Sequence, residues 1–209
     1  MRRWAGLLAA LLCASAAAAD RACLAAAARS QVGVTLHYDP AYTQLAYPLG
    51  DVPIERGVCT DVLIRAYRQF GIDLQQRVHE DMRAHFDRYP RNWGLQRPDR
   101  NIDHRRVPNL ATFFARHGER LAIDQSDDEW QAGDIVVWRL ASGVPHIGLV
   151  SEHRSVTGVP LVLHNIGRGT REEDVLHAYT ITGAYRYRPD ALAEGCPAPP
   201  RADAGARPR

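Results

Sequence analysis

The order of the predicted elements along the chain indicates an α+β fold. Segments with the spacing of amphipathic helices occupy the first part of the sequence, and β-branched segments separated by glycines occupy the second. The β-branched segments recur at intervals of about ten residues without helical segments between them, which favours an antiparallel sheet. The chain has 209 residues, a length that suits one domain with its own core.

The N-terminus has the features of a secretory signal peptide. Two arginines precede an apolar run, and small residues follow up to Ala19. We therefore expect residues 1–19 to be cleaved on export, which places the mature domain, residues 20–188, in the periplasm or outside the cell. The alternatives are an uncleaved membrane anchor, for which the run is short, and a lipoprotein signal around Cys13, which the preceding leucines fit poorly.

Helical spacing predicts four helices in the first part of the mature chain. The first segment is alanine-rich, and the second repeats apolar residues at helical intervals after Cys59. A proline near its start and a glycine after its end bound the fourth segment. The predicted helices are residues 22–32, the segment from Cys59 to Gly71, and residues 75–88 and 107–117.

Four strands follow, with glycines marking the turns between them. Their spacing allows the second and third strands to pair as a hairpin. The predicted strands are residues 134–138, 146–150, 161–164 and 179–187. Residues 189–209 are rich in proline, alanine and arginine, and we expect them to form a disordered tail.

Cys59 is the candidate nucleophile, because it stands where a helix begins. The unpaired N–H groups and the dipole at a helix N-terminus favour a thiolate. Signal cleavage leaves Cys23, Cys59 and Cys196, and an odd number of cysteines leaves one unpaired. A disulfide between Cys23 and Cys196 would join the two ends of the domain and leave Cys59 free, whereas a Cys23–Cys59 disulfide would block the proposed chemistry.

A cysteine nucleophile needs a base and a residue that orients the base. His146 opens the second predicted strand and His164 closes the third, so a hairpin brings both to one end of the sheet. Asn165 competes with His164 for the orienting role. Because successive strand residues face opposite sides, only one of these two can point at Cys59.

Several short motifs resemble known families. The motifs GVCTDV, GDIVVW, HIGLV and VLHNIG occur in an order that resembles the NlpC-type cell-wall cysteine peptidases, which have a papain-like fold. More closely, VHEDM, YPRNWGL, PDRNIDHRRVPNL and HNIGRG resemble the bacterial domain of unknown function family 1287, which is placed in the same group. The resemblance covers about residues 25–188.

The resemblance implies a papain-like catalytic domain whose helices pack on an antiparallel sheet. Cys59 matches the nucleophile, His146 the base and His164 the orienting residue of an enzyme that hydrolyses amide bonds in peptidoglycan peptides. Tyr47 matches a tyrosine that lines the site in that group. Asp61 departs from the usual Asp-Cys-Ser-Gly pattern, and it either caps the helix or contacts a cationic group of the substrate.

The remaining predictions concern binding. Asp103 and His104 lie in a polar loop that recognises substrate or bonds to itself, and Trp93 and Trp138 are expected in the core.

No cofactor or metal is expected, and alternatives to an enzyme are a binding or scaffolding domain and a zinc site at the cysteine and the two histidines. The mature chain has balanced charge and no long basic run, so nucleic acid is not an expected partner, and no second apolar segment is long enough to span a membrane.

Overall fold

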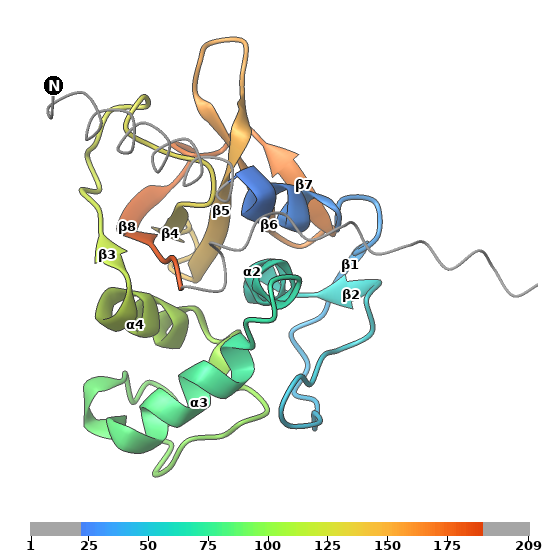
Figure 1. The fold of residues 1–209 in the computed structure, drawn as a ribbon, viewed down its shortest axis with the longest axis vertical. Coiled ribbons are helices and arrows are strands. Elements are labelled where there is room, and N and C mark those ends of the chain that lie inside the picture. Colours follow the sequence, from blue (N-terminus) through green and yellow to red (C-terminus); the bar gives the residue numbers. More distant parts are fainter. Residues whose placement is uncertain (1–21, 190–209) are drawn as a thin grey trace, which may run out of the picture.

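The computed structural model describes residues 22–189, and it confirms the α+β prediction with helices first and an antiparallel sheet second (Figure 1). The helical elements are the segment 22–29, α2 (Cys59–Arg68), α3 (Leu74–Ala84) and α4 (Val107–His117), with 3-10 turns η1 (Phe86–Arg88) and η2 (Asp103–Arg105). The predicted signal peptide lies outside the described residues, as does all but the first residue of the predicted tail.

A six-stranded sheet forms the second half of the domain. Its order is β3-β8-β4-β5-β6-β7, and every neighbouring pair is antiparallel. The strands are β3 (Glu119–Arg120), β4 (Ile135–Arg139), β5 (Pro145–Arg154), β6 (Pro160–Asn165), β7 (Thr170–Glu173) and β8 (Thr180–Arg186). The predicted hairpin is confirmed as β5 and β6, in which Leu149 lies opposite Leu163. Two short strands, β1 (His37–Tyr38) and β2 (Arg56–Gly57), form a separate parallel pair.

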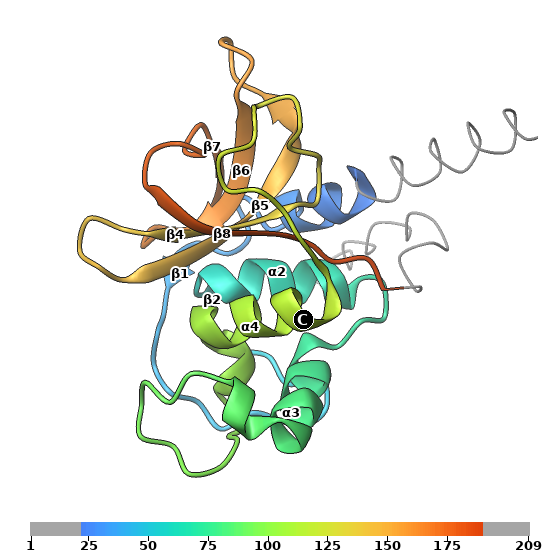
Figure 2. The ribbon, with the colours of Figure 1, turned by 90° about the vertical axis from the view of Figure 1, so that its left-hand side faces the viewer.

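The helices cover one face of the sheet. Figure 2 shows α2 directly beneath the sheet, α4 just below α2, and α3 farther out. Because α2 lies in the middle of this arrangement, all of its residues except Arg68 are buried. The element that begins with Cys59 is therefore the central helix of the domain.

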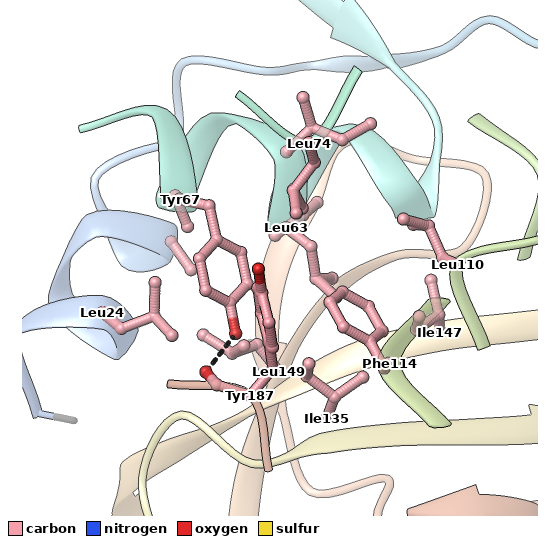
Figure 3. Close-up of a cluster of buried hydrophobic side chains, with 14 of the residues drawn as sticks. Leu24, Leu63, Tyr67, Leu74, Leu110, Phe114, Ile135, Ile147, Leu149 and Tyr187 are labelled. Carbon is pink, nitrogen blue, oxygen red and sulfur yellow. Dashed lines mark hydrogen bonds between the residues drawn. The ribbon is translucent and has the colours of Figure 1, made fainter. Parts of the chain in front are cut away.

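The core between helices and sheet consists of large apolar side chains. Leu63 and Tyr67 of α2 face Leu149 of β5 and Phe114 of α4, and all four are fully buried (Figure 3). The Tyr67 hydroxyl donates a hydrogen bond of 3.0 Å to the carbonyl of Tyr187, so its one polar atom is satisfied. Full burial of a leucine side chain such as Leu63 stabilises the fold by roughly 2 kcal/mol.

The opposite face of the sheet carries a second apolar cluster around Trp138. A Cβ atom at Gly148 would lie 2.6 Å from Val162 and 3.0 Å from the Trp138 ring, so only glycine leaves room for this indole. The prediction of Trp138 as a core residue is confirmed, because the side chain is fully buried. The same prediction for Trp93 is wrong, because that residue is 44% exposed.

Candidate active site

Cys59 is the first residue of α2 and a buried free thiol. Cys23 is disulfide-bonded, so the alternative in which Cys23 pairs with Cys59 is wrong. The predicted partner of Cys23, Cys196, lies outside the described residues. The Cys59 thiol at the start of the central helix is thus not blocked by a disulfide.

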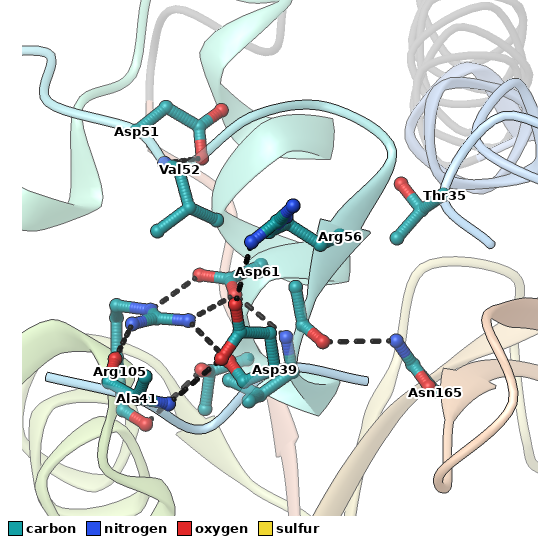
Figure 4. Close-up of polar contacts among 12 residues, drawn as sticks. Thr35, Asp39, Ala41, Asp51, Val52, Arg56, Asp61, Arg105 and Asn165 are labelled. Atoms are coloured by element: carbon teal, nitrogen blue, oxygen red, sulfur yellow. Dashed lines mark hydrogen bonds and ion pairs between the residues drawn. The ribbon is translucent and has the colours of Figure 1, made fainter. Parts of the chain in front are cut away.

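Side chains from distant segments hold the turn that precedes Cys59. The side-chain amide of Asn165 donates to the carbonyl oxygens of Gly57, at 3.1 Å, and His37, at 3.4 Å (Figure 4). A Cβ atom on Gly57 would approach the Asp61 carboxylate to 3.0 Å, so glycine allows the tight turn. Asn165 therefore positions the turn before the nucleophile and does not orient a histidine.

Asp61 forms a buried ion pair with Arg105 (Figure 4). The guanidinium donates to both carboxylate oxygens, at 3.0 and 2.9 Å, and the N–H of Val58 donates to one of them at 2.7 Å. This last bond caps the start of α2, since a helix leaves its first N–H groups unpaired. Both side chains are nearly inaccessible, so the structure directs the Asp61 charge to Arg105 and not to a substrate.

An open cleft of about 470 Å³ lies beside Cys59. Two arginines and three aromatic residues line it, together with apolar residues, and no acidic side chain is among the described residues of its wall. The Arg106 guanidinium lies 4.1 Å from the centre of the Trp93 ring, at a cation–π distance. The lining residues are Tyr38, Pro40, Tyr42, Val58, Cys59, Trp93, Ile102, Arg105, Arg106, Val107, Pro108, Val144 and Pro145.

Tyr38 occupies the position beside the nucleophile that the sequence interpretation assigned to Tyr47. Tyr38 lines the cleft, and burial together with the nearby Cys59 raises the pKa of its hydroxyl to about 12. Tyr47 packs edge-on against His79, with ring centres 5.3 Å apart, and does not line the cleft. The sequence does indicate a tyrosine-rich loop before Cys59. Choosing the tyrosine by its distance from Cys59 along the chain gives Tyr47, whereas the structure places Tyr38 in the cleft.

Asp103 and His104 are buried in η2 and do not line the cleft. Asp103 accepts a hydrogen bond from the N–H of Asp99 at 2.5 Å and lies 3.5 Å from the Arg106 guanidinium. Burial lowers the pKa of His104 to about 3, so this ring stays neutral. These positions agree with the alternative in which the polar loop bonds to itself.

The two predicted histidines meet on the neighbouring strands β5 and β6. Nε2 of His146 lies 3.0 Å from Nδ1 of His164, and Nε2 of His164 lies 3.1 Å from a carboxylate oxygen of Glu173. The His146 ring stacks on Trp138, with centres 5.6 Å apart and planes within 18°. His164, and not Asn165, therefore contacts His146, and Glu173 extends the chain of contacts.

The first residues of β5 contact the Cys59 thiol through the backbone. The backbone N–H of Ile147 points at the Cys59 sulfur, as do the N–H groups of Cys59 and Thr60. His146 directly precedes Ile147, and Pro145 before it lines the cleft. The start of β5 thus reaches the thiol through its backbone, whereas the His146 ring stacks on Trp138, on the face of the sheet opposite α2.

Burial decides the resting protonation states of the candidate pair. It raises the pKa of the Cys59 thiol to about 12, outweighing the three N–H groups that favour the thiolate, and the Asp61 charge adds to the rise. Burial, with a contribution from His164, lowers the pKa of His146 to about 3. The resting pair is therefore a thiol and a neutral imidazole, although the helix N-terminus alone favours a thiolate.

These pKa values predict how Cys59 reacts in the absence of substrate. Because only the thiolate is alkylated, the rate with iodoacetamide should rise about tenfold per pH unit from about pH 7 to about pH 10, with no plateau below pH 8. Quenching the alkylation at timed intervals and analysing the protein by mass spectrometry measures this rate. Denatured protein, whose thiol has an ordinary pKa, is the control. A plateau below pH 8 in the folded protein would contradict the expected state.

The histidines do not form the predicted zinc alternative. Three of the four ring nitrogens of the pair, all except Nδ1 of His146, face each other or Glu173 at hydrogen-bond distance. Within residues 22–189, no three or more His, Cys, Asp or Glu side chains are grouped as metal ligands. The arrangement is that of a hydrogen-bonded chain.

Comparison with known proteins agrees with the closer of the two resemblances. A family model described as domain of unknown function DUF1287 matches residues 25–187. The chain belongs to this family. A curated relative of the DUF1287 chain, the uncharacterized protein YijF of Escherichia coli (strain K12), is 57% identical over 164 residues, which cover 78% of this chain and 80% of YijF. Kinship with the NlpC-type peptidases stays a prediction.

Proposed function

We propose that this DUF1287 protein is an exported cysteine amidase or peptidase with a papain-like catalytic domain. One observation carries the proposal: the free thiol of Cys59, at the start of the central helix, opens on a cleft beside the strand that presents His146. Acyl transfer requires a nucleophile and a base that reaches it, and His146 is the proposed base. The order of helices and antiparallel strands is compatible with the papain-like group.

The proposed reaction begins with the Cys59 thiol protonated and the His146 imidazole neutral. Nδ1 of His146, the nitrogen that does not face His164, takes the thiol proton as the Cys59 sulfur attacks the amide carbon. The imidazolium then gives this proton to the leaving amine as the C–N bond breaks. Water adds to the thioester while His146 takes a proton from it, the C–S bond breaks, and the proton returns to the thiolate.

The start of α2 supplies the donors that the reaction needs. Backbone N–H groups at a helix start have no partner within the helix, and the N–H of Cys59 is one of them. Such a donor stabilises the negative charge that develops on the carbonyl oxygen of the substrate. The Asp61–Arg105 pair and Asn165 hold this part of the backbone in place.

The proposed substrates are peptides of the cell wall. A cleft lined by aromatic side chains and Arg106, with no acid among its described lining, suits a peptide that carries a free carboxylate, since Arg105 is already paired with Asp61. The disulfide at Cys23 supports an oxidising compartment, in line with the proposed export to the periplasm or beyond. Among residues 22–189, no helix combines the length and the apolar character needed to cross a membrane.

A binding domain of the same fold is the second candidate. The high pKa of the Cys59 thiol favours it, because a thiol that stays protonated is a poor nucleophile. Such a domain would hold cell-wall peptides in the same cleft without cleaving them.

Digestion of purified peptidoglycan separates the two candidates. Wild-type protein should release peptides with new termini, visible by mass spectrometry, and Cys59→Ala should release none. Co-sedimentation of Cys59→Ala with peptidoglycan would show that binding survives. Binding without any new product from the wild type would support the second candidate, and equal products from both proteins would remove Cys59 from the mechanism.

A further inference from the structure

Glu173 is a partly buried residue that contacts the histidine pair. No motif in the sequence indicates it. It is the last residue of β7, and its side chain is 24% exposed, whereas His164 is fully buried. One carboxylate oxygen faces Nε2 of His164 at 3.1 Å, and the other accepts from Arg168 at 3.3 Å. Glu173 therefore closes a chain that runs from His146 through His164 to a carboxylate.

The direction of each hydrogen bond in this chain follows from the carboxylate. An ionised carboxylate only accepts, so Nε2 of His164 must carry a proton and donate it. A neutral imidazole has one N–H, so Nδ1 of His164 then has no proton and accepts from Nε2 of His146. His146 is left with a bare Nδ1, which is the form that can take a proton from a thiol.

We propose that Glu173 is a positioning residue that sets the tautomer of the base, His146, through the intervening ring of His164. This inference rests on the proposed function, since it concerns the base of that reaction. Burial lowers the pKa of His164 more than the Glu173 charge raises it, so the intervening ring carries a single proton. With one proton on each ring, the carboxylate decides which nitrogen of His146 is free.

The opposite arrangement explains why the carboxylate is needed. Without an acceptor at Nε2, His164 can carry its proton on Nδ1 and donate it to Nε2 of His146. His146 would then hold its own proton on Nδ1 and could not accept another from Cys59. The stacked Trp138 ring fixes the plane of His146 but does not choose between the two tautomers.

The variant Glu173→Gln tests the proposal with little change in shape. Its side-chain amide can donate to Nε2 of His164, which permits the unproductive tautomers. The matched control is Glu172→Gln on the same strand, whose carboxylate contacts Arg29 and Ser151 instead. Nitrogen-15 NMR of the histidine rings should show Nε2–H in both His146 and His164 of the wild type, and a shift towards Nδ1–H in Glu173→Gln only.

Activity is the second readout. We expect Glu173→Gln to lower kcat about 10- to 100-fold with little change in KM, and Glu172→Gln to leave both unchanged. A wild-type His164 that carries its proton on Nδ1, or tautomers that do not respond to Glu173→Gln, would overturn the inference. If the wild type hydrolyses nothing, the proposed function fails, while the NMR measurement still decides the role of Glu173.

Discussion

Replacing His146 with alanine should lower the rate of amide hydrolysis by about 10²- to 10⁴-fold, the usual loss when a general base is removed. The effect is expected to be large because the pKa of Cys59 is raised to about 12, so thiolate does not form without a base. Steady-state hydrolysis of a defined peptide from the cell wall measures the loss, and thermal unfolding checks that the variant is folded.

His153→Ala is the matched control, because His153 lies on the same strand but its side chain is 54% exposed and faces Glu172. It should hydrolyse the peptide at the wild-type rate. A folded His146→Ala protein that retains more than about a tenth of wild-type activity would exclude His146 as the base.

Asp61→Asn should reduce the free energy of unfolding by about 3–5 kcal/mol, because it leaves the buried Arg105 charge without its partner. Both side chains are almost fully inaccessible, so water cannot replace the lost carboxylate. The substitution also removes a charge that raises the pKa of Cys59, so alkylation at a fixed pH should become faster. Urea unfolding and the alkylation rate measure the two effects.

Asp128→Asn is the control for a surface pair, since Asp128 is 99% exposed and lies 3.7 Å from Arg154. It should leave the stability essentially unchanged. The double variant Asp61→Asn with Arg105→Met removes the unpaired charge and should recover part of the lost stability. Equal stability of Asp61→Asn and the wild type would show that the pair does not hold the start of α2.

Much of the fold can be predicted because most of its helices and strands have clear local sequence patterns. The fourth helix was predicted with the bounds that α4 has, and the hairpin of β5 and β6 followed from two β-branched runs around a glycine. β7 was missed because its sequence, Thr-Arg-Glu-Glu, has low strand propensity. It is a strand because β6 offers it a free edge, which is a long-range effect.

Some residues of the candidate site can also be predicted from local patterns, and others cannot. A cysteine at a helix start and histidines at strand ends are local patterns, so Cys59, His146 and His164 could be selected from the sequence. Tyr38 and Glu173 could not, because their places depend on how a loop and an unpredicted strand fold back on the domain. Asp61 was identified as unusual, but its partner Arg105 is the last residue of η2, far along the chain.

Local patterns in the sequence are enough to predict the order of helices and strands, the cysteine at a helix start and the two histidines that face each other. The charge state of these groups depends on how the chain packs around them. A helix N-terminus favours a thiolate, but the packing around Cys59 excludes water and raises its pKa to about 12. Solvation depends on everything that packs around a group, and no local pattern contains that information.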